Sequence, residues 1–548
     1  MKLVCTTFTI ICLVSGLYYS QVKTTFYSAF ESISSDNIYR HLQILANDSL
    51  EGRAVGTKGA EKAADYISNY FSEINLERIS KDRSYFQNVP MHGSDALNNS
   101  ELVYILDKDT MVLTFAEDYY LYRSGQQTFM PSFLPIVFVG YGIVAPEFDY
   151  NDYQSVDVAG KIVVYLDGEP SSEDDEFFNG PLSTIYSNAE SKRRIAFARG
   201  CAGTIQIASK NYENWDDVRK DFQFEDVTLA YSVSGNLNIL LNVQEADILF
   251  FGSEYSFNDV IEMHNNHSIK SFDLQSKMRF RGVFKERDFI SPNVIGMIEG
   301  ADPELKNSFL IISAHYDHLG IGEPVMGDSI YNGALDNAIG VSVLLELAKS
   351  FSSLESKPKR SIIFIATTGE EKGLLGSIYY TDNPLVPLYK TIANVNIDGI
   401  AMFKDFSSIV GIGSEFSTLD KFLDDTADKY ELEVQSIPPQ FRQVGAFNNS
   451  DQLAFAKAGI PSIIILEGTK NTIKSEEEVV EAFIDYYLNR YHSPQDDLNQ
   501  KIDYEAAEKH TKVLFDFCYQ LANSKNEPEW KAGAQFINAR LQSIAEEK

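Results

Sequence analysis

The stretch SFLIISAHYD, residues 308–317, and the stretch SIIFIATTGEE, residues 361–371, decide the fold class. Each is an unbroken apolar run that ends in polar side chains, and the helical pattern AIGVSVLLELAKSF, residues 338–351, lies between them. Strands that are apolar on both faces are typical of a parallel sheet covered by helices on both sides. The two runs therefore predict an α/β domain with much parallel pairing.

Similar apolar runs continue on either side of these stretches. The sequence before them has a different pattern of apolar and polar residues. The further runs are NVIGMIEG (293–300), TIANVNIDGI (391–400), SIVGIG (408–413) and PSIIILEG (461–468). Residues 95–285 instead carry short β-like runs, such as PIVFVGYGIV (135–144), interrupted by acidic or glycine-bearing turns. Residues 34–78 show helical spacing twice, around the loop LEGRAVGTKG (50–59). We predict a mostly β domain over 95–285 and a helical tail over 526–548.

Length and charge narrow the class of protein. At 548 residues the chain exceeds what one hydrophobic core normally supports, so we expect more than one domain. Its 78 Asp and Glu residues against 47 Lys and Arg residues give a formal charge of -31, which repels phosphate backbones and anionic membranes. We expect no nucleic-acid partner. Such a field attracts cationic ligands, for example a peptide with a free amino terminus, although an acidic surface often serves solubility alone.

The first residues resemble an export signal. Residues 1–20 contain one lysine and then an apolar run from Leu3 to Val14, which is too short to span a bilayer but fits the core of a signal peptide. An uncleaved anchor is the alternative. We expect a secreted or periplasmic protein without a stable membrane anchor after cleavage, in which Cys201 and Cys518 remain unpaired.

Polar side chains follow the apolar runs at the ends where ligands bind in α/β sheets. They are His315, Asp317, His318, Asp336, Glu370, Glu371, Asp398 and, farther on, His492 in YHSPQDD. Each residue alone can be explained by a structural role without a ligand. Asp336 could cap a helix, Asp398 could lie in a turn, and the glutamates could form a solvated first helical turn. As a set they match two zinc-class ions, which need imidazoles, carboxylates, one bridging carboxylate and a free carboxylate as general base.

The ordered motifs AHYDHLG, NGALDNAIG, TTGEEKGLLGS, NIDG, SDQLAFAKAGIPSI and YHSPQDD resemble the M28 family of zinc aminopeptidases. The stretches FVGYGIVAPEFDYNDYQSVDVAGKIVVYLDGEP and KRRIAFARGCAGTI are similar to the protease-associated domain often inserted into members of that family. The resemblance implies a phosphorylase/hydrolase-like sandwich formed by residues 21–94 and 286–525. It also implies that residues 95–285 are the inserted protease-associated domain.

Carried over by motif, the resemblance implies two Zn²⁺ ions per chain. His315 and Asp398 would hold one ion, Glu371 and His492 the other, and Asp336 would bridge them. Glu370 would be the general base and then the general acid. Asp317 would orient the His315 imidazole, and the peptide bond after Asp336 would be cis.

Two departures leave oxyanion stabilisation and substrate contacts open. Many relatives have histidine at the position of Gln452, and several have a tyrosine shortly before that segment, where this chain has none. The candidates on the substrate side are Tyr491, His318, Arg442, Asn449 and Asp451. Zinc itself could alternatively act on the oxyanion.

The expected function is removal of amino-terminal residues from peptides by a di-zinc exopeptidase. Carboxypeptidases, dipeptidases and a glutaminyl-cyclase-like enzyme share this fold and stay open as alternatives, and so does a receptor-like protein without catalysis. The complete set of expected ligands and the spare Glu370 argue against the receptor-like alternative. Oligomeric state and side-chain preference are not readable from this sequence.

Overall fold

The computed structural model divides the chain into two compact units, which we describe separately. It describes residues 26–121, 129–170, 176–178, 180, 184–208, 215–233, 235–438 and 446–546. The first unit comprises Met1–Val89, Ser291–Pro438 and Asn449–Lys548, and the second comprises Pro90–Ile290 and Pro439–Asn448. The predicted signal segment, 1–20, lies outside the described residues. Among the helices of the described residues, none has the length and apolarity needed to cross a membrane.

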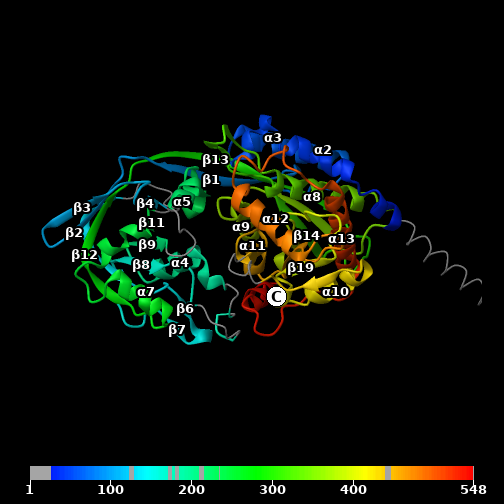
Figure 1. Ribbon diagram of the computed structural model, residues 1–548. Coiled ribbons are helices and arrows are strands. Elements are labelled where there is room, and N and C mark those ends of the chain that lie inside the picture. The colour runs from blue at the N-terminus through cyan, green and yellow to red at the C-terminus, as the bar shows by residue number, and fades with distance from the viewer. Residues whose placement is uncertain are drawn as a thin grey trace, which may run out of the picture. The chain divides into compact units, whose positions relative to one another are not determined.

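A mixed sheet forms the centre of the first unit (Figure 1). The strands, in spatial order, are β10 (Asp226–Leu229), β1 (Phe86–Ala96), β13 (Phe284–Ile298), β17 (Ser361–Thr367), β14 (Phe309–His315), β18 (Thr391–Asn396), β21 (Ser462–Glu467), β19 (Ser408–Ile412) and β20 (Glu433–Gln435). Strand β14 pairs in parallel with β17 and β18, and β18 pairs in parallel with β21. Strands β13 and β19 add antiparallel pairs to β17 and β21. The predicted α/β class with a largely parallel sheet is confirmed.

Both faces of the central strands β14, β17 and β18 are buried, which explains why most of their side chains are apolar. Along β14, Leu310 and Ile312 join the core on one face, whereas Phe309 and Ile311 join a separate core on the other. The first face carries α2 (Ser35–Leu45), α3 (Lys58–Glu73), α8 (Ile339–Ser352), α10 (Leu419–Lys429) and α13 (Tyr504–Asn523). The second carries α9 (Leu375–Asp382) and α11 (Gln452–Lys457). This layering holds the strand ends in a fixed register.

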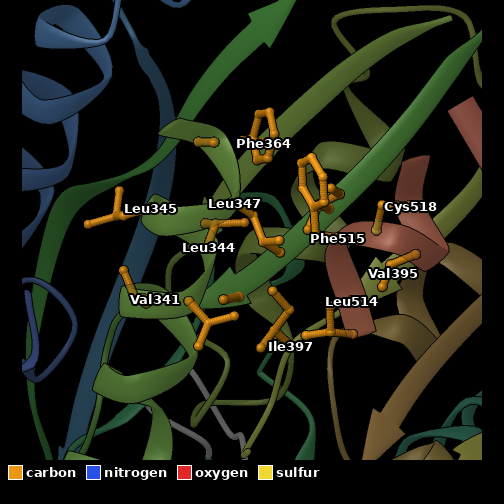
Figure 2. Close-up of a cluster of buried hydrophobic side chains, with 14 of the residues drawn as sticks. Val341, Leu344, Leu345, Leu347, Phe364, Val395, Ile397, Leu514, Phe515 and Cys518 are labelled. Atoms are coloured by element: carbon orange, nitrogen blue, oxygen red, sulfur yellow. The ribbon is translucent and has the colours of Figure 1, made fainter. Parts of the chain in front are cut away.

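Helix α8 is the centre of the larger core. Figure 2 shows its side chains Val341, Leu344 and Leu347 packed with residues of the sheet and of α13, including Phe364 and Phe515. Phe351 and Phe515 pack with ring centroids 4.5 Å apart. Because a helix enclosed in this way cannot shift without opening cavities, the loop before its first residue is held in place as well.

The remaining elements of the first unit lie around this sandwich. They are the hairpin of β15 (Gly320–Val325) and β16 (Asp328–Tyr331), helix α12 (Glu476–Asn489) and helix α14 (Ile537–Ala545). Helix α14 lies within residues 526–548, and Arg540 ties it to the unit by donating to the carbonyls of Leu388 and Thr391.

The second unit is built on another sheet. In spatial order its strands are β3 (Asp109–Leu113), β2 (Glu101–Leu106), β12 (Phe272–Arg281), β5 (Phe129–Phe138), β8 (Ile162–Leu166), β9 (Gly203–Ala208), β11 (Leu237–Asn242) and β4 (Tyr119–Leu121). Also described here are β6 (Val144–Ala145), β7 (Tyr150–Asn151), α4 (Ala189–Ala198), α5 (Trp215–Phe222), α6 (Ala246–Phe250) and α7 (Phe257–Asn265). The unit has its own hydrophobic core. Its identity as a protease-associated domain stays a prediction.

A buried glutamate at the end of β21 makes the stability of the first unit depend on pH. Glu467 accepts hydrogen bonds from the backbone amides of Met402 at 2.6 Å and Phe403 at 3.3 Å. Its other oxygen is buried and has no hydrogen-bond partner among the described residues. Burial raises the pKa of Glu467 from its ordinary value of 4.5 to about 7.

We predict that Glu467→Gln stabilises the protein at pH 8 relative to the wild type but not at pH 4.5. The unfolded chain releases this proton near pH 4.5 and the folded chain near pH 7, so wild-type stability falls across that window. The full difference is roughly 3 kcal/mol, because each pKa unit corresponds to about 1.4 kcal/mol. Urea unfolding of both proteins at the two pH values measures it. An equal difference at both pH values would contradict the assignment.

Candidate metal centre

The expected metal ligands meet because parallel strands end at one edge of the sheet. Strand β14 ends at His315, which lies opposite Thr367 at the end of β17. Glu370 and Glu371 follow β17 after a short turn, and Asp398 follows β18. The carboxyl ends of parallel strands are the usual ligand-binding edge of such sheets. The structure brings together the side chains that the sequence places after separate strands.

Asp336 lies in an irregular turn, Ala334–Ala338, directly before α8. Its backbone is not helical, with φ -117° and ψ 91°, and its peptide bond to Asn337 is cis, as expected. Gly333 enters the turn with φ 56°, and a Cβ there would lie 2.5 Å from the His318 ring. Only glycine therefore fits at this position without moving His318.

The two carboxylate oxygens of Asp336 face two different pairs of side chains. Oδ1 lies 3.3 Å from Nε2 of His315, which is 3.4 Å from Oδ1 of Asp398. Oδ2 lies 3.3 Å from Nε2 of His492, which is 3.2 Å from Oε2 of Glu371. Tetrahedral zinc with bonds of 2.0–2.1 Å separates its ligand atoms by about 3.3 Å. The spacing in each group is therefore that of ligand atoms around a tetrahedral zinc ion.

His315 provides a direct test of whether a cation fits this position. Its Nδ1 lies 3.2 Å from the backbone oxygen of Asp317 and donates to it, so Nε2 is the ring nitrogen that faces the carboxylates. That Nε2 atom is buried and makes no hydrogen bond to any described residue. Burial lowers the pKa of His315, but Glu370 and Asp398 outweigh it and raise the pKa well above its ordinary value. A negative field around a buried imidazole nitrogen suits a metal ion.

Adjacent glutamates at this edge have opposite acid–base properties. Burial and the charges of Glu371 and Asp398 raise the pKa of Glu370 well above its ordinary value. Burial also opposes ionisation of Glu371, but His492 and His318 outweigh it and lower the pKa of Glu371 to about 2. An ionised Glu371 suits a ligand, and a carboxylate with a raised pKa suits a proton carrier. The two roles are therefore separated by environment.

Asp317 contacts the backbone of Glu370 rather than an imidazole. Its Oδ1 accepts a hydrogen bond from the amide of Glu370 at 3.1 Å, whereas Nδ1 of His315 is 4.0 Å away. The His315 ring is oriented by the backbone oxygen of Asp317. The Asp317 side chain thus acts on the turn that carries both glutamates.

The candidate residues for substrate contact lie in different environments. The Tyr491 ring stacks on His492 with centroids 3.9 Å apart and is 38% exposed, so it reaches the surface beside the site. Asn449 is exposed as well. Asp451 is fully buried and accepts a hydrogen bond from the hydroxyl of Thr367. His318 is also fully buried. Arg442 lies outside the described residues.

Sequence reasoning missed two charged residues that hold the Asp336 turn. The carboxylate of Asp496 accepts hydrogen bonds from the amides of Leu335 at 2.9 Å and Asp336 at 3.0 Å. The guanidinium of Arg53 donates to the carbonyls of Asn332 at 2.6 Å and Gly333 at 3.0 Å, as well as to those of Leu45 and Tyr316. Asp496 could have been found, since it follows His492 in YHSPQDD. Arg53 gave only one signal, an arginine within a glycine-rich loop.

Comparisons with known proteins point to one family. Residues 293–518 match the model of peptidase family M28. Aminopeptidase YwaD of Bacillus subtilis is 24% identical over 262 residues, 48% of each chain. Aminopeptidase NAALADL1 of Mus musculus is 36% identical over 121 residues, 21% of this chain and 14% of that protein. The alignments therefore span about half the length of the first relative and a small part of the second.

A solved structure extends the likeness of the fold. The aminopeptidase from Aneurinibacillus sp. strain AM-1 has a TM-score of 0.53 and 18% identity, and the match covers 92% of this chain and 97% of that one. The resemblance stated from the motifs is confirmed over residues 293–518, which carry the histidines and carboxylates described above. Over residues 293–518 the chain therefore resembles peptidase family M28, and the solved structure supports the likeness of the fold.

Proposed function

We propose that this chain is a di-zinc aminopeptidase that removes amino-terminal residues from peptides. The observation that carries the proposal is the division of the two Asp336 oxygens between the His315–Asp398 pair and the His492–Glu371 pair. One carboxylate that serves two histidine–carboxylate pairs is what a pair of ions requires. A single-ion site would need only one pair.

In this assignment His315 and Asp398 would hold one zinc ion, Glu371 and His492 would hold the other, and Asp336 would serve both. Zinc, when bound, supplies Lewis acidity that polarises a carbonyl oxygen and acidifies water. The family match and the names of the aminopeptidase relatives support peptide substrates, and the spacing of the ligand atoms around Asp336 supports zinc. The count of two ions rests on the geometry of Asp336.

Glu370 is the general base in this proposal. It takes a proton from the attacking water and delivers it to the amine that leaves when the peptide bond breaks. Burial and the neighbouring carboxylates raise its pKa, which favours proton uptake, and the hydrogen bond from its amide to Asp317 fixes the turn that carries it. The carboxylates around the site favour a substrate whose amino terminus is charged.

The remaining assignments concern the chain as a whole. Residues 95–285 are proposed as an inserted protease-associated domain on the strength of the motifs quoted above. Residues 1–20 are proposed as an export signal, which makes the protein secreted or periplasmic. Tyr491 and Asn449 are the described substrate-contact candidates that reach the surface.

Adjacent glutamates offer a matched pair of variants. We expect Glu370→Gln to keep the zinc content of the wild type but to lower kcat by about 10²- to 10⁴-fold, because the proton carrier is removed and no ligand is lost. Glu371→Gln and Asp336→Ala should lose zinc as well as activity. Metal analysis of each purified variant beside its kcat distinguishes the two classes. A normal rate for Glu370→Gln would reassign the base.

Substrate polarity tests the aminopeptidase assignment. Short peptides with a free amino terminus should release their first residue, and the same peptides with an acetylated amino terminus should not be cleaved. Amino-acid analysis of the products, with zinc content measured on the same sample, gives both results. Cleavage of acetylated peptides would favour the carboxypeptidase alternative. Protein without zinc and without turnover would favour a binding protein.

A further inference from the structure

His318 makes a contact that neither metal coordination nor the general base accounts for. Its Nδ1 lies 2.7 Å from Oε1 of Glu371, while Oε2 of the same carboxylate lies 3.2 Å from Nε2 of His492. An ionised carboxylate only accepts hydrogen bonds, so Nδ1 of His318 is the donor. The two oxygens of Glu371 therefore have different partners.

The position of the His318 ring does not depend on Glu371. The backbone amide of His318 donates to the carbonyl of Arg53 at 3.3 Å, and the side chain is fully buried. The absence of a side chain at Gly333 leaves the space that the ring fills. The ring also packs against His492, with centroids 5.8 Å apart. The donor is thus held before any ligand binds, which is the condition for positioning a carboxylate.

We propose that His318 is a positioning residue that holds Glu371 with one oxygen, Oε2, directed at the metal, and that it thereby sets the affinity of one of the two metal positions. This inference rests on the proposed di-zinc function. The polar atoms of His318 approach Glu371 and, at 4.0 Å, Oδ2 of Asp336, the oxygen that faces His492. Its effect should therefore fall on the Glu371–His492 position and spare the His315–Asp398 position.

Three substitutions separate a hydrogen-bond donor from a metal ligand or a packing residue. In His318→Asn the side-chain amide nitrogen takes the place of Nδ1 and can still donate to Glu371. His318→Leu keeps apolar volume and removes the donor. His318→Gln moves the amide towards the position of Nε2 and serves if the leucine variant does not fold. His267→Asn, at an exposed position of the second unit, controls for the loss of a histidine.

The experiment is titration of the chelator-stripped apoprotein with Zn²⁺ against a competing chromogenic chelator, with Co²⁺ absorption spectra as a second readout. We expect two binding steps for the wild type. In His318→Leu or His318→Gln one dissociation constant should rise by about 10- to 100-fold and the other should change little. His318→Asn and His267→Asn should stay close to the wild type. The effect should persist in an Asp398→Ala background and vanish in a His492→Ala background.

Distinct outcomes would overturn the inference and the function. Unchanged binding in both His318→Leu and His318→Gln would overturn the role of His318 alone. A loss in His318→Asn as large as in His318→Leu would also overturn it, because a donor at the Nδ1 position would then not suffice. Wild-type protein that binds no zinc would overturn the proposed function and this inference with it.

Discussion

Repulsion among buried carboxylates is the constraint on which the first unit depends. Asp317, Asp336 and Glu370 are buried at one edge of the sheet, and the side chain of Glu371 beside them is 4% exposed. Two like charges 4 Å apart repel by about 4 kcal/mol at an effective dielectric constant of 20. A cluster of buried carboxylates is therefore stable only when positive charges lie between them. The imidazoles, a protonated Glu370 and bound cations are the means available at this edge. The same concentration of carboxylates therefore makes the site suitable for cations and destabilises the fold.

The irregular turn around Asp336 is stabilised by charged side chains that bind its backbone. A turn that leaves helical geometry has backbone groups without regular partners, and buried groups of this kind must be satisfied. Arg53 donates hydrogen bonds to the carbonyls of Asn332 and Gly333, and Asp496 accepts hydrogen bonds from the amides of Leu335 and Asp336. Both are charged, so their hydrogen bonds to the backbone are strong. The bridging carboxylate is consequently held from two sides by residues that lie far from it in the sequence.

The fold could be predicted largely because a strand buried on both faces is recognisable from the apolar residues of that strand alone. The runs 309–315, 361–367 and 391–396 are mostly apolar and are buried along their whole length, and each became a central strand. For amphipathic helices, the sequence predicted less exactly which side chains are buried. In α2, Ile38, Leu42 and Leu45 are buried as the helical spacing indicates, but Ile44 is 43% exposed because it points away from α8 and α13. Spacing identifies a helix, but it does not say which neighbour covers each side chain.

The sequence by itself determined the fold class of the first unit and the set of donor side chains at the strand ends, because strand periodicity and strand order act over short stretches of chain. Only the tertiary structure decided which oxygen of Asp336 faces which histidine, that His318 turns towards Glu371, and that Arg53 and Asp496 hold the turn. These contacts join residues 21 to 280 positions apart, as between Asp336 and His315 or Arg53 and Gly333. Their directions depend on the packing of whole elements, and no local pattern of side chains encodes that packing.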